Sequence, residues 1–387
     1  MKFFHTADWH LGKIIQSVYM TEDQEYILHQ FIDAVREEKP DAILIAGDLY
    51  DRAVPPTEAV ELLNRTLHEL VVNQKTPVLA IAGNHDSPDR IAFASSIMQG
   101  QGLYLSGRLD GDFAPVVLHD EYGPVHVYLV PYADPSRVRT VLGDEEIRTH
   151  DDAARAITNR ILEARIPGVR CVLVGHAFVT PSGEKEDMEN ASDAERPLSI
   201  GGAEYVHARY FKPFQYTALG HLHQAHHVGD ETIRYAGSPL KYSISEEKHK
   251  KGFYIVEMDG EGQVRVDKRL LAPRRDMRTV RATMEELERH ERSDDYVFVQ
   301  LTDENPVLSA MERIRSVYPY AMHVTQQLMI PQAEELTAER IEPAEKDDVA
   351  LFRAFYKEVK GAELSAEKEE VFRSVLEEVF AKEGERV

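Results

Sequence analysis

Cysteine and tryptophan are the scarcest residues in this 387-residue chain, which contains one of each. A single cysteine excludes a disulfide within the chain and a thiolate-rich metal site, and it favours a reducing compartment such as the cytoplasm. Cys171 stands in an apolar, strand-like segment. We therefore expect it to be a buried core residue rather than a catalytic thiol.

Long apolar runs are also missing. No stretch approaches the roughly 20 residues that a membrane-spanning helix needs. The first residues, MKFFHTADWHLG, interrupt their apolar run at His5 and Asp8, which is unlike a secretory signal. Hydrophobic residues make up 43% of the chain and charged residues 29%, which is typical of a soluble globular protein. The length allows two or three domains.

Positive charge is in deficit, because the formal net charge is −22. Proteins that hold nucleic acid by electrostatics usually present a basic face. A role on nucleic acid would therefore require bound cations, a local basic strip or a partner that supplies positive surface. The run KHKK at 248–251 is such a local strip, although a solvated turn is the first interpretation of it.

Short apolar runs alternate with amphipathic stretches from residue 1 to about 270, which predicts an α/β domain. Helices are expected at 21–38, 57–73 and 151–165. After about residue 205 strands dominate, which favours a mixed sheet or two packed sheets over a single doubly wound one. The expected strands are 2–6, 42–46, 78–82, 125–130, 169–174, 215–219, 232–236 and 252–258.

The expected helix at 57–73 illustrates the pattern. Thr57 is the candidate N-cap. The expected apolar face consists of Val60, Leu63, Leu67 and Leu70.

Composition divides the chain into a main domain at 1–272, a small α/β domain at 273–330, a charged linker at 331–348 and a helical hairpin at 349–387. A polar, acidic stretch at 183–202 reads as a long loop, and such loops are often functional. The hairpin has more apolar residues than two helices can bury between themselves. We expect it to dock on a partner, with packing against its own domain as the alternative.

Polar side chains follow the ends of five expected strands, in FFHTADWH, ILIAGD, LAIAGNHD, CVLVGH and YTALGHLH. In open α/β sheets, ligands gather beyond the carboxyl ends of the strands. We therefore expect the side chains that these segments deliver to converge on one site. They are Asp8, His10, Asp48, Asn84, His85, His176, His221 and His223.

Carboxylate, amide and imidazole ligands together suit Mn²⁺, Fe²⁺ or Zn²⁺. The set is too large for one ion, and two ions with Asp48 as the bridging carboxylate account for it. Two cations roughly 3.5–4 Å apart form a clamp for displacement at phosphorus. Together they acidify a water molecule and stabilise charge on the phosphate oxygens.

The segments DWH, GDLYDR, GNHD, GHAF and GHLH resemble the signature of the calcineurin-like metallophosphoesterases. HTADWHLGK, ERPLSIGGAEYV and YAGSPLKYSISEEKHKKGF are similar in particular to the SbcD family, the nuclease subunits of bacterial SbcC–SbcD complexes. The resemblance extends over essentially the whole chain. It implies a four-layer α/β/β/α sandwich, a small capping domain and a C-terminal helical hairpin that docks the SbcC ATPase. A homodimer within a heterotetramer is also implied.

The resemblance implies a Mn²⁺-dependent DNA nuclease, with 3′→5′ exonuclease action on double strands and endonuclease action on single strands and hairpins. DNA repair, replication and recombination, in the cytoplasm at the nucleoid, are the implied setting. One alternative is a small-molecule phosphodiesterase or phosphoprotein phosphatase with the same dinuclear site. Another is a non-catalytic scaffold, which the complete ligand set argues against.

The resemblance also implies roles for individual residues. One cation would be held by Asp8, His10, Asp48 and His223, and the second by Asp48, Asn84, His176 and His221. His85 would not be a ligand but would face the scissile phosphate and assist the leaving group.

The neighbours of these residues leave alternatives open. Asp51 stands where some relatives have a second histidine. Asp86 is expected to cap a helix, with orientation of His85 as the alternative. Trp9 is expected to pack beneath the site. Lys13, Arg52 and Arg90 are either surface charges or phosphate contacts.

Overall fold

The computed structural model describes residues 1–184, 204–326 and 348–384. The loop expected at 183–202 and the linker expected at 331–348 therefore fall almost entirely outside the described residues. The chain divides into two compact units. The first comprises 1–280, 292–298 and 318–323, and the second comprises 281–291, 299–317 and 324–387. The domain boundaries expected from composition stay predictions.

The first unit is built on two six-stranded sheets. One sheet has the order β16-β15-β1-β4-β5-β6 and the other β13-β14-β12-β9-β8-β7. The strands of the first sheet are β1 (Lys2–Thr6), β4 (Ala42–Ile45), β5 (Val78–Ile81), β6 (Leu103–Ser106), β15 (Gly252–Met258) and β16 (Val264–Leu270). Those of the second are β7 (Val116–Asp120), β8 (Gly123–Val130), β9 (Arg170–His176), β12 (Tyr216–Gly220), β13 (His226–Val228) and β14 (Asp230–Tyr235).

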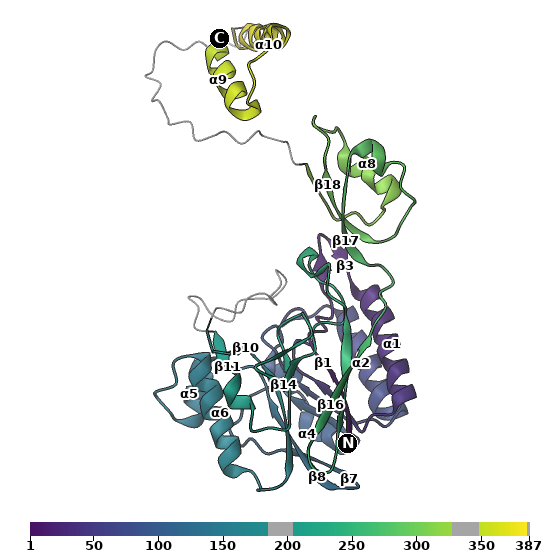
Figure 1. Ribbon diagram of the computed structural model, residues 1–387, viewed down its shortest axis with the longest axis vertical. Coiled ribbons are helices and arrows are strands. Elements are labelled where there is room, and N and C mark those ends of the chain that lie inside the picture. The colour runs from purple at the N-terminus through teal and green to yellow at the C-terminus, as the bar shows by residue number, and fades with distance from the viewer. Residues whose placement is uncertain (185–203, 327–347, 385–387) are drawn as a thin grey trace. The chain divides into compact units, whose positions relative to one another are not determined.

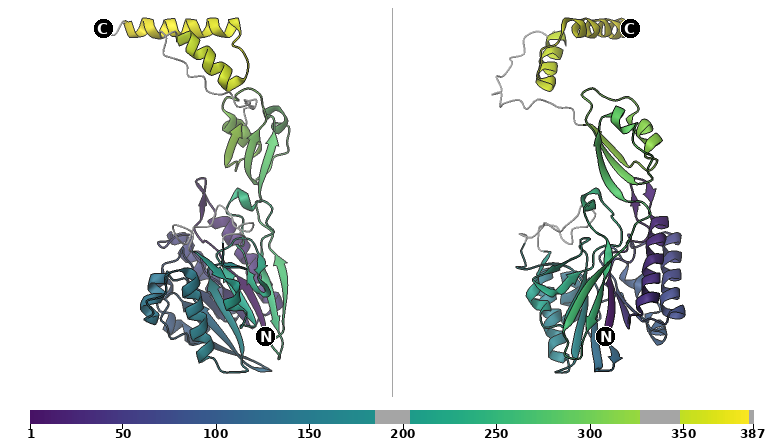
Figure 2. Two further views of the ribbon diagram at one scale, coloured as in Figure 1. Left: turned by 60° about the vertical axis from the view of Figure 1, so that its left-hand side comes forward. Right: turned by 45° about the vertical axis from the view of Figure 1, so that its right-hand side comes forward.

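Helices cover the outer face of each sheet, so the unit has four layers. In Figure 1, α1 (Thr21–Glu38) and α2 (Thr57–His68) lie on one flank, and α5 (Pro135–Leu142) and α6 (His150–Ala164) lie on the opposite flank. Figure 2 shows the sheets between them. This is the α/β/β/α sandwich expected from the resemblance.

Three apolar clusters hold the layers together. The middle one lies between the sheets and includes Phe3, Leu44 and Val174, all fully buried. The outer two pack each sheet against its helices, for example through Phe31 of α1 and Ile161 of α6. Each such side chain contributes about 1.5–3 kcal/mol when fully buried, so the sandwich is the stable body on which the loops are mounted.

The central strands run parallel, which brings their carboxyl ends to one edge. In the first sheet β1, β4 and β5 pair in parallel. In the second, β9 pairs in parallel with β12. The sheets approach closely at this edge, because a Cβ atom added to Gly220 would lie 1.9 Å from the carbonyl oxygen of Ala46. Only glycine fits there, and its absence of a side chain lets the loops of the two sheets meet.

The second helix differs from expectation in detail. It begins at Thr57 with Pro56 in the N-cap position, so Thr57 is not the cap, and it continues beyond His68 as a π-helical turn at Glu69–Asn73. Val60 is 42% exposed, so its place on the expected buried face is wrong. The buried residues of α2 are Ala59, Leu62, Leu63 and Thr66, and Leu70 in the following turn is buried too, so Leu63 and Leu70 of the expected face are confirmed.

Several short elements were not expected. They include β2 (Ile14–Ile15), β3 (Val18–Tyr19), β10 (Phe178–Thr180), β11 (Tyr205–His207) and α4 (Ser95–Met98). The helix expected just after Asp86 is α3 (Pro88–Ile91). The edge strands β6, β7, β13 and β16 were also missed. These strands are partly exposed, so their apolar pattern is weak.

The remaining elements lie after residue 276. A third sheet has the order β17-β18-β19. The elements are β17 (Met277–Ala282), α7 (Met284–Leu287), β18 (Tyr296–Leu301), α8 (Ala310–Val317), β19 (His323–Gln326), α9 (Asp348–Lys360) and α10 (Ala366–Gly384). Gly361 follows α9 with a φ of 64°, as expected for a helix stop.

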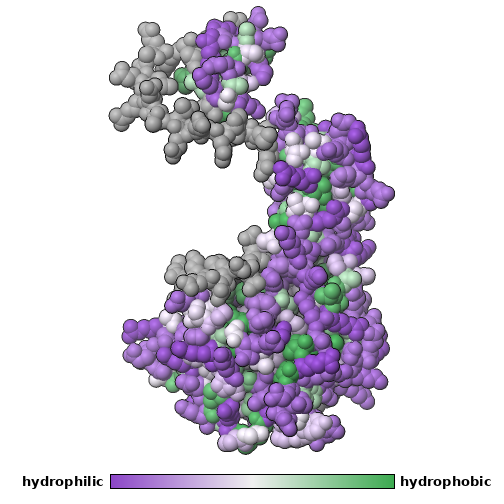
Figure 3. Space-filling view, in the orientation of Figure 1, coloured by the Kyte–Doolittle hydropathy of each residue, from purple (hydrophilic) through white to green (hydrophobic). Residues whose placement is uncertain are grey.

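The surface is largely hydrophilic on the face shown in Figure 3, with apolar residues in small groups. In the part of the chain that the structure describes, no helix combines the length and apolar character needed to cross a membrane.

Candidate metal centre

The loop after β1 carries Asp8 and His10, both fully buried. Both residues have positive φ angles, 54° and 45°, which non-glycine residues rarely adopt. Backbone hydrogen bonds to the loop after β4 hold this conformation, from the Asp8 amide to the Gly47 carbonyl (3.0 Å) and from the His10 amide to the Asp48 carbonyl (2.9 Å). The two loops are therefore tied together, and the strained backbone aims both side chains inward.

Asp48 lies between the other polar side chains. Its Oδ2 atom is 3.6 Å from Nε2 of His10 and 3.5 Å from Nε2 of His176. Its Oδ1 atom accepts a hydrogen bond from the His85 amide (2.9 Å). A single carboxylate oxygen is thus almost equidistant from imidazoles of two sheets, which is the geometry that a bridging ligand requires.

A glycine makes this position of Asp48 accessible. A Cβ atom added to Gly83 would lie 2.2 Å from Oδ1 of Asp48, so any other residue at position 83 would displace the carboxylate or the loop. The loop after β5 therefore passes directly over Asp48, and Asn84 and His85 follow at once in the chain.

His176, the last residue of β9, is held in one orientation. Its Nδ1 atom donates to the carbonyl oxygen of Ala46 (2.9 Å), so in the neutral ring Nε2 bears the lone pair. That nitrogen lies 2.8 Å from Oδ1 of Asn84. A lone pair facing an amide oxygen at this distance is unfavourable by itself and favourable when both coordinate one cation.

His10 and His223 form a similar pair. Their Nε2 atoms are 3.1 Å apart, and Nδ1 of His223 donates to Oε1 of Glu246 (2.9 Å). Nε2 of His223 therefore also points its lone pair into the site. Two imidazole nitrogens that coordinate one cation at about 2.1 Å lie about this far apart. The donor set and its orientations fit divalent cations.

His221 joins the two sheets. Its amide donates to both carboxylate oxygens of Asp8, at 3.0 and 3.2 Å. Its ring centroid is 5.4 Å from that of His176. Burial, and then the neighbouring His176, lowers the pKa of His221 well below its ordinary value. Burial followed by His223 does the same to the pKa of His10. Both rings are neutral at pH 7, and a neutral imidazole is the form that binds a metal.

The structure brings all eight expected side chains to one edge of the sandwich. Among the residues that the structure describes, two groups of three histidine or aspartate side chains have ligand atoms within 4.8 Å of one another. They are Asp8, Asp48 and His176, and His10, Asp51 and His85. Oδ1 of Asp8 lies 4.0 Å from Nδ1 of His176, within the first of these groups, and the division of ligands between two cations stays a proposal.

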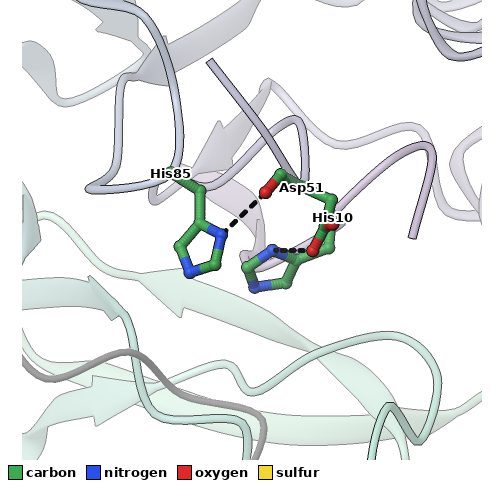
Figure 4. Close-up of side chains that lie close together, drawn as sticks. All are labelled: His10, Asp51 and His85. Carbon is green, nitrogen blue, oxygen red and sulfur yellow. Dashed lines mark hydrogen bonds and ion pairs between the residues drawn. The ribbon is translucent and has the colours of Figure 1, made fainter. Parts of the chain in front are cut away.

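The orientation of His85 is fixed by Asp51. Nδ1 of His85 donates to the main-chain carbonyl of Asp51 (2.9 Å), as Figure 4 shows. The Asp51 carboxylate is 3.8 Å from Nδ1 of His10 and 2.9 Å from the ammonium group of Lys13. Because Nδ1 is engaged in the bond to the Asp51 carbonyl, Nε2 is the nitrogen of His85 that can exchange a proton. Lys13 pairs with the site's own carboxylate.

The expectation that Asp86 caps a helix is wrong, because Ser87 is the N-cap residue of α3. The Asp86 carboxylate accepts three backbone hydrogen bonds, from the amides of Leu49 (3.1 Å), Tyr50 (2.9 Å) and Gly83 (2.9 Å). Burial, and then the nearby Asp48, raises the pKa of Asp86 to about 7. Asp86 therefore clamps the loop of Asp48 to the loop of Asn84.

Other expectations can be compared with the structure. Trp9 is 1% exposed and its indole donates to Thr6 (2.9 Å), so it packs beneath the site as expected. Cys171 is a buried core residue. Lys251, in the run KHKK, is 8% exposed, so a solvated turn is wrong for that residue.

Reasoning from sequence missed the residues behind the ligands. Glu246 and Lys251 are buried and hydrogen-bonded to His223, and Gln24 donates to the carbonyl oxygen of His10 (2.8 Å). Although burial alone would raise the pKa of Glu246, Lys251 and His223 outweigh it and hold that pKa well below its usual range. The signal available was an acidic pair, Glu246 and Glu247, beside a basic run.

Similarity to known proteins extends over nearly the whole chain. A model of the calcineurin-like phosphoesterases matches residues 1–225, and one of the type 5 capsule protein repressor C-terminal domain matches residues 273–360. The chain is 30% identical to the D subunit of nuclease SbcCD from Staphylococcus epidermidis, over 99% of this chain and 100% of that protein.

Solved structures also resemble it. A dimetal phosphatase from Danio rerio matches 70% of this chain and 96% of its own, with 14% identity and a TM-score of 0.44. The protein TT1561 of Thermus thermophilus matches 69% and 98%, with 12% identity and a TM-score of 0.40.

Proposed function

The chain belongs to the calcineurin-like phosphoesterases and, within them, to the family of SbcCD nuclease D subunits, and on this premise we propose that it is the metal-dependent DNA nuclease subunit of such a complex. Its proposed activities are 3′→5′ exonuclease action on double strands and endonuclease action on single strands and hairpins. The proposed setting is DNA repair, replication and recombination in the cytoplasm, at the nucleoid. The observation that carries the proposal is the position of Asp48 Oδ2 between His10 and His176.

We assign each proposed ligand to one of the two cations, or in the case of Asp48 to both, from its contacts with the neighbouring ligands. Asp8, His10, Asp48 and His223 would hold one cation, and Asp48, Asn84, His176 and His221 the other. When bound, the cations polarise the phosphodiester and lower the pKa of a water molecule beside it. Mn²⁺ is the proposed metal, because oxygen and imidazole ligands in equal measure suit it.

His85 supplies the proton in this scheme. The carbonyl of Asp51 fixes its ring from behind, and its amide bonded to Asp48 fixes its backbone. His85 Nε2 would donate a proton to the departing alkoxide as the bond to phosphorus breaks. Asp86 would keep the loop that carries His85 in a fixed position relative to Asp48 during turnover.

Nuclease activity can be tested directly on the purified chain. With Mn²⁺, it should cut blunt and hairpin oligonucleotides and should leave a cyclic nucleotide much less affected. Preference for the cyclic nucleotide would indicate a small-molecule phosphodiesterase instead. Bound metal without any hydrolysis would indicate a scaffold.

The C-terminal hairpin is the proposed docking element for the SbcC ATPase. Its two helices contact through the stacked rings of Phe352 and Phe372, whose centroids are 3.8 Å apart. Other apolar side chains of the hairpin face solvent, each more than half exposed. They are Leu351, Phe355, Val371 and Val375. An apolar face of this size on a helix pair supports a helical partner such as the root of a coiled coil.

Deletion of 349–387 is expected to abolish association with the ATPase and to leave phosphodiesterase turnover on a small substrate unchanged. Gel filtration of the mixed subunits measures the first effect, and hydrolysis of a chromogenic phosphodiester with Mn²⁺ measures the second. The control is a full-length chain in which Arg353 is replaced, so that the ion pair with Glu369 within the hairpin is lost. It shows how association with the ATPase responds when the hairpin is perturbed but still present. Co-elution of the truncated chain with the ATPase would refute the docking role.

A homodimer through the first unit is the proposed assembly. A groove of about 910 Å³ runs between α2 and the segment that holds α3 and α4. Its apolar rim includes Phe93, which is 78% exposed, with Val60 and Val72 beside it. Ile97, also 78% exposed, extends the apolar character of α4. A second copy of the chain would cover this face.

Phe93→Asp is expected to shift the chain from dimer to monomer, because a carboxylate would be buried at the interface. Sedimentation velocity at micromolar concentration measures the change. Tyr122→Asp, at a residue of similar exposure distant in sequence from the groove, should leave the dimer intact. An unchanged sedimentation coefficient for the Phe93 variant would place the interface elsewhere.

A further inference from the structure

A buried chain of polar side chains lies behind His223. Nδ1 of His223 donates to Oε1 of Glu246 (2.9 Å), and Oε2 of Glu246 accepts from Nζ of Lys251 (2.5 Å). The side chains of His223, Glu246 and Lys251 are 1%, 0% and 6% exposed. Water therefore does not compete for these bonds, and the carboxylate is held at both oxygens.

Lys251 is itself held in place. Its ammonium group also donates to the carbonyl oxygen of His223 (2.8 Å) and to Oγ of Ser238 (2.8 Å). The amide of Tyr242 adds a further bond to Oε2 of Glu246 (3.3 Å). The lysine thus neutralises the buried carboxylate and anchors the backbone of the residue whose ring the carboxylate orients.

The two proposed cation positions differ in the group that orients a ligand histidine from behind. His176 is oriented by a neutral carbonyl, that of Ala46, whereas His223 is oriented by a carboxylate. A carboxylate behind a ligand histidine fixes the ring and makes the opposite nitrogen a stronger donor. His10 has the Asp51 carboxylate at 3.8 Å, beyond hydrogen-bond distance. Among the rings of His10, His176 and His223, the strongest support of this kind is therefore at His223.

We propose that Glu246, held by Lys251, is a positioning residue that sets the cation affinity of the position shared by His223 and His10, and of that position only. The inference rests on the proposed two-cation centre. Because such outer partners typically contribute 10–100-fold in metal affinity, the two cations are expected to bind with unequal strength, and the unequal binding depends on Glu246.

The test measures Mn²⁺ binding to the full chain. Titration calorimetry and the electron paramagnetic resonance signal of free Mn²⁺ are the two methods. In Glu246→Gln, which keeps the size and an acceptor oxygen, one of the two binding steps is expected to weaken about 10–100-fold. The other step is expected to keep its wild-type affinity. Thermal unfolding of the metal-free protein shows whether the variant folds.

Two further variants sharpen the result. Glu246→Gln with Lys251→Met removes both buried charges together, so it avoids an unpaired lysine, and it should show the same selective loss. Glu247→Gln makes the same chemical change one residue along, where the carboxylate accepts from the amide (2.9 Å) and hydroxyl (2.8 Å) of Thr279. It should bind both cations as the wild type does.

The outcomes separate the two proposals. Wild-type affinity at both steps in Glu246→Gln, or equal weakening of both steps, would overturn the role of Glu246 and leave the nuclease proposal standing. Two cations bound by a wild-type chain that does not cut DNA would overturn the nuclease proposal alone. A wild-type chain that binds no cations would overturn both.

Discussion

His85→Gln is expected to lower DNA cleavage by about 10²–10⁴-fold while two Mn²⁺ ions remain bound. Glutamine is close to histidine in length and can still form hydrogen bonds, but it cannot transfer a proton near neutral pH. The backbone amide of residue 85 would keep its bond to Asp48, because that bond does not depend on the side chain. Rates of hairpin cleavage and metal content on the same sample measure the two effects.

The controls for this variant are a distant histidine and a better leaving group. His227→Gln changes an exposed histidine outside the site and should cut at the wild-type rate. With a nitrophenyl phosphodiester, whose leaving group needs no proton, His85→Gln should lose much less activity than with DNA. Loss of a metal ion would show that His85 is a ligand, and equal loss on both substrates would show that it does not act as a general acid.

The positions of the site residues were predictable because they depend on strand ends. Strands β1, β4, β5, β9 and β12 all read as apolar runs that stop at polar residues. Parallel strands of one sheet end at one edge, so the side chains at 8, 48 and 84 had to be near one another. Chain order and apolar pattern are enough for this conclusion, and the contacts at Asp48 agree with it.

The supporting residues were not predictable, because their partners are distant in the chain. Glu246 meets His223 from a turn whose sequence shows only an excess of charge. Asp86 bonds to amides near residue 50, which no local pattern links to it. Such contacts depend on how the loops of two sheets pack, and that packing leaves no periodic signal in the sequence.

The error at α2 has a different physical origin. Its expected apolar face was drawn through Val60, which is 42% exposed, whereas Leu63 and Leu70 of that face are buried. Ala59 and Thr66, which were not expected on it, are buried as well. Helical spacing locates the centre of the apolar face but not how far the buried face extends to either side of it. The small side chains of Ala59 and Thr66 permit close approach to the core, and the exposed Val60 then lies at the groove proposed for the dimer.

Asp48→Asn is expected to remove both cations at a Mn²⁺ concentration that saturates the wild type, and to reduce cleavage by about 10³-fold or more. The reason is the single oxygen between His10 and His176, since its negative charge would offset both cations at once. An asparagine keeps the shape but is neutral, so each cation would lose its only shared anionic ligand. Metal content after equilibration, with cleavage rates in parallel, measures the effect.

Two variants show whether the loss is specific to the shared position. Asn84→Ala removes a ligand from one side, so it is expected to release one cation and retain the other. Asp33→Asn makes the same chemical change on the surface of α1, where the carboxylate is 62% exposed and pairs only with Arg36 among the described ion pairs. It should bind two cations and cut normally. If Asp48→Asn retained one cation with wild-type affinity, Asp48 would serve a single ion, and the two positions would be independent rather than joined through its carboxylate.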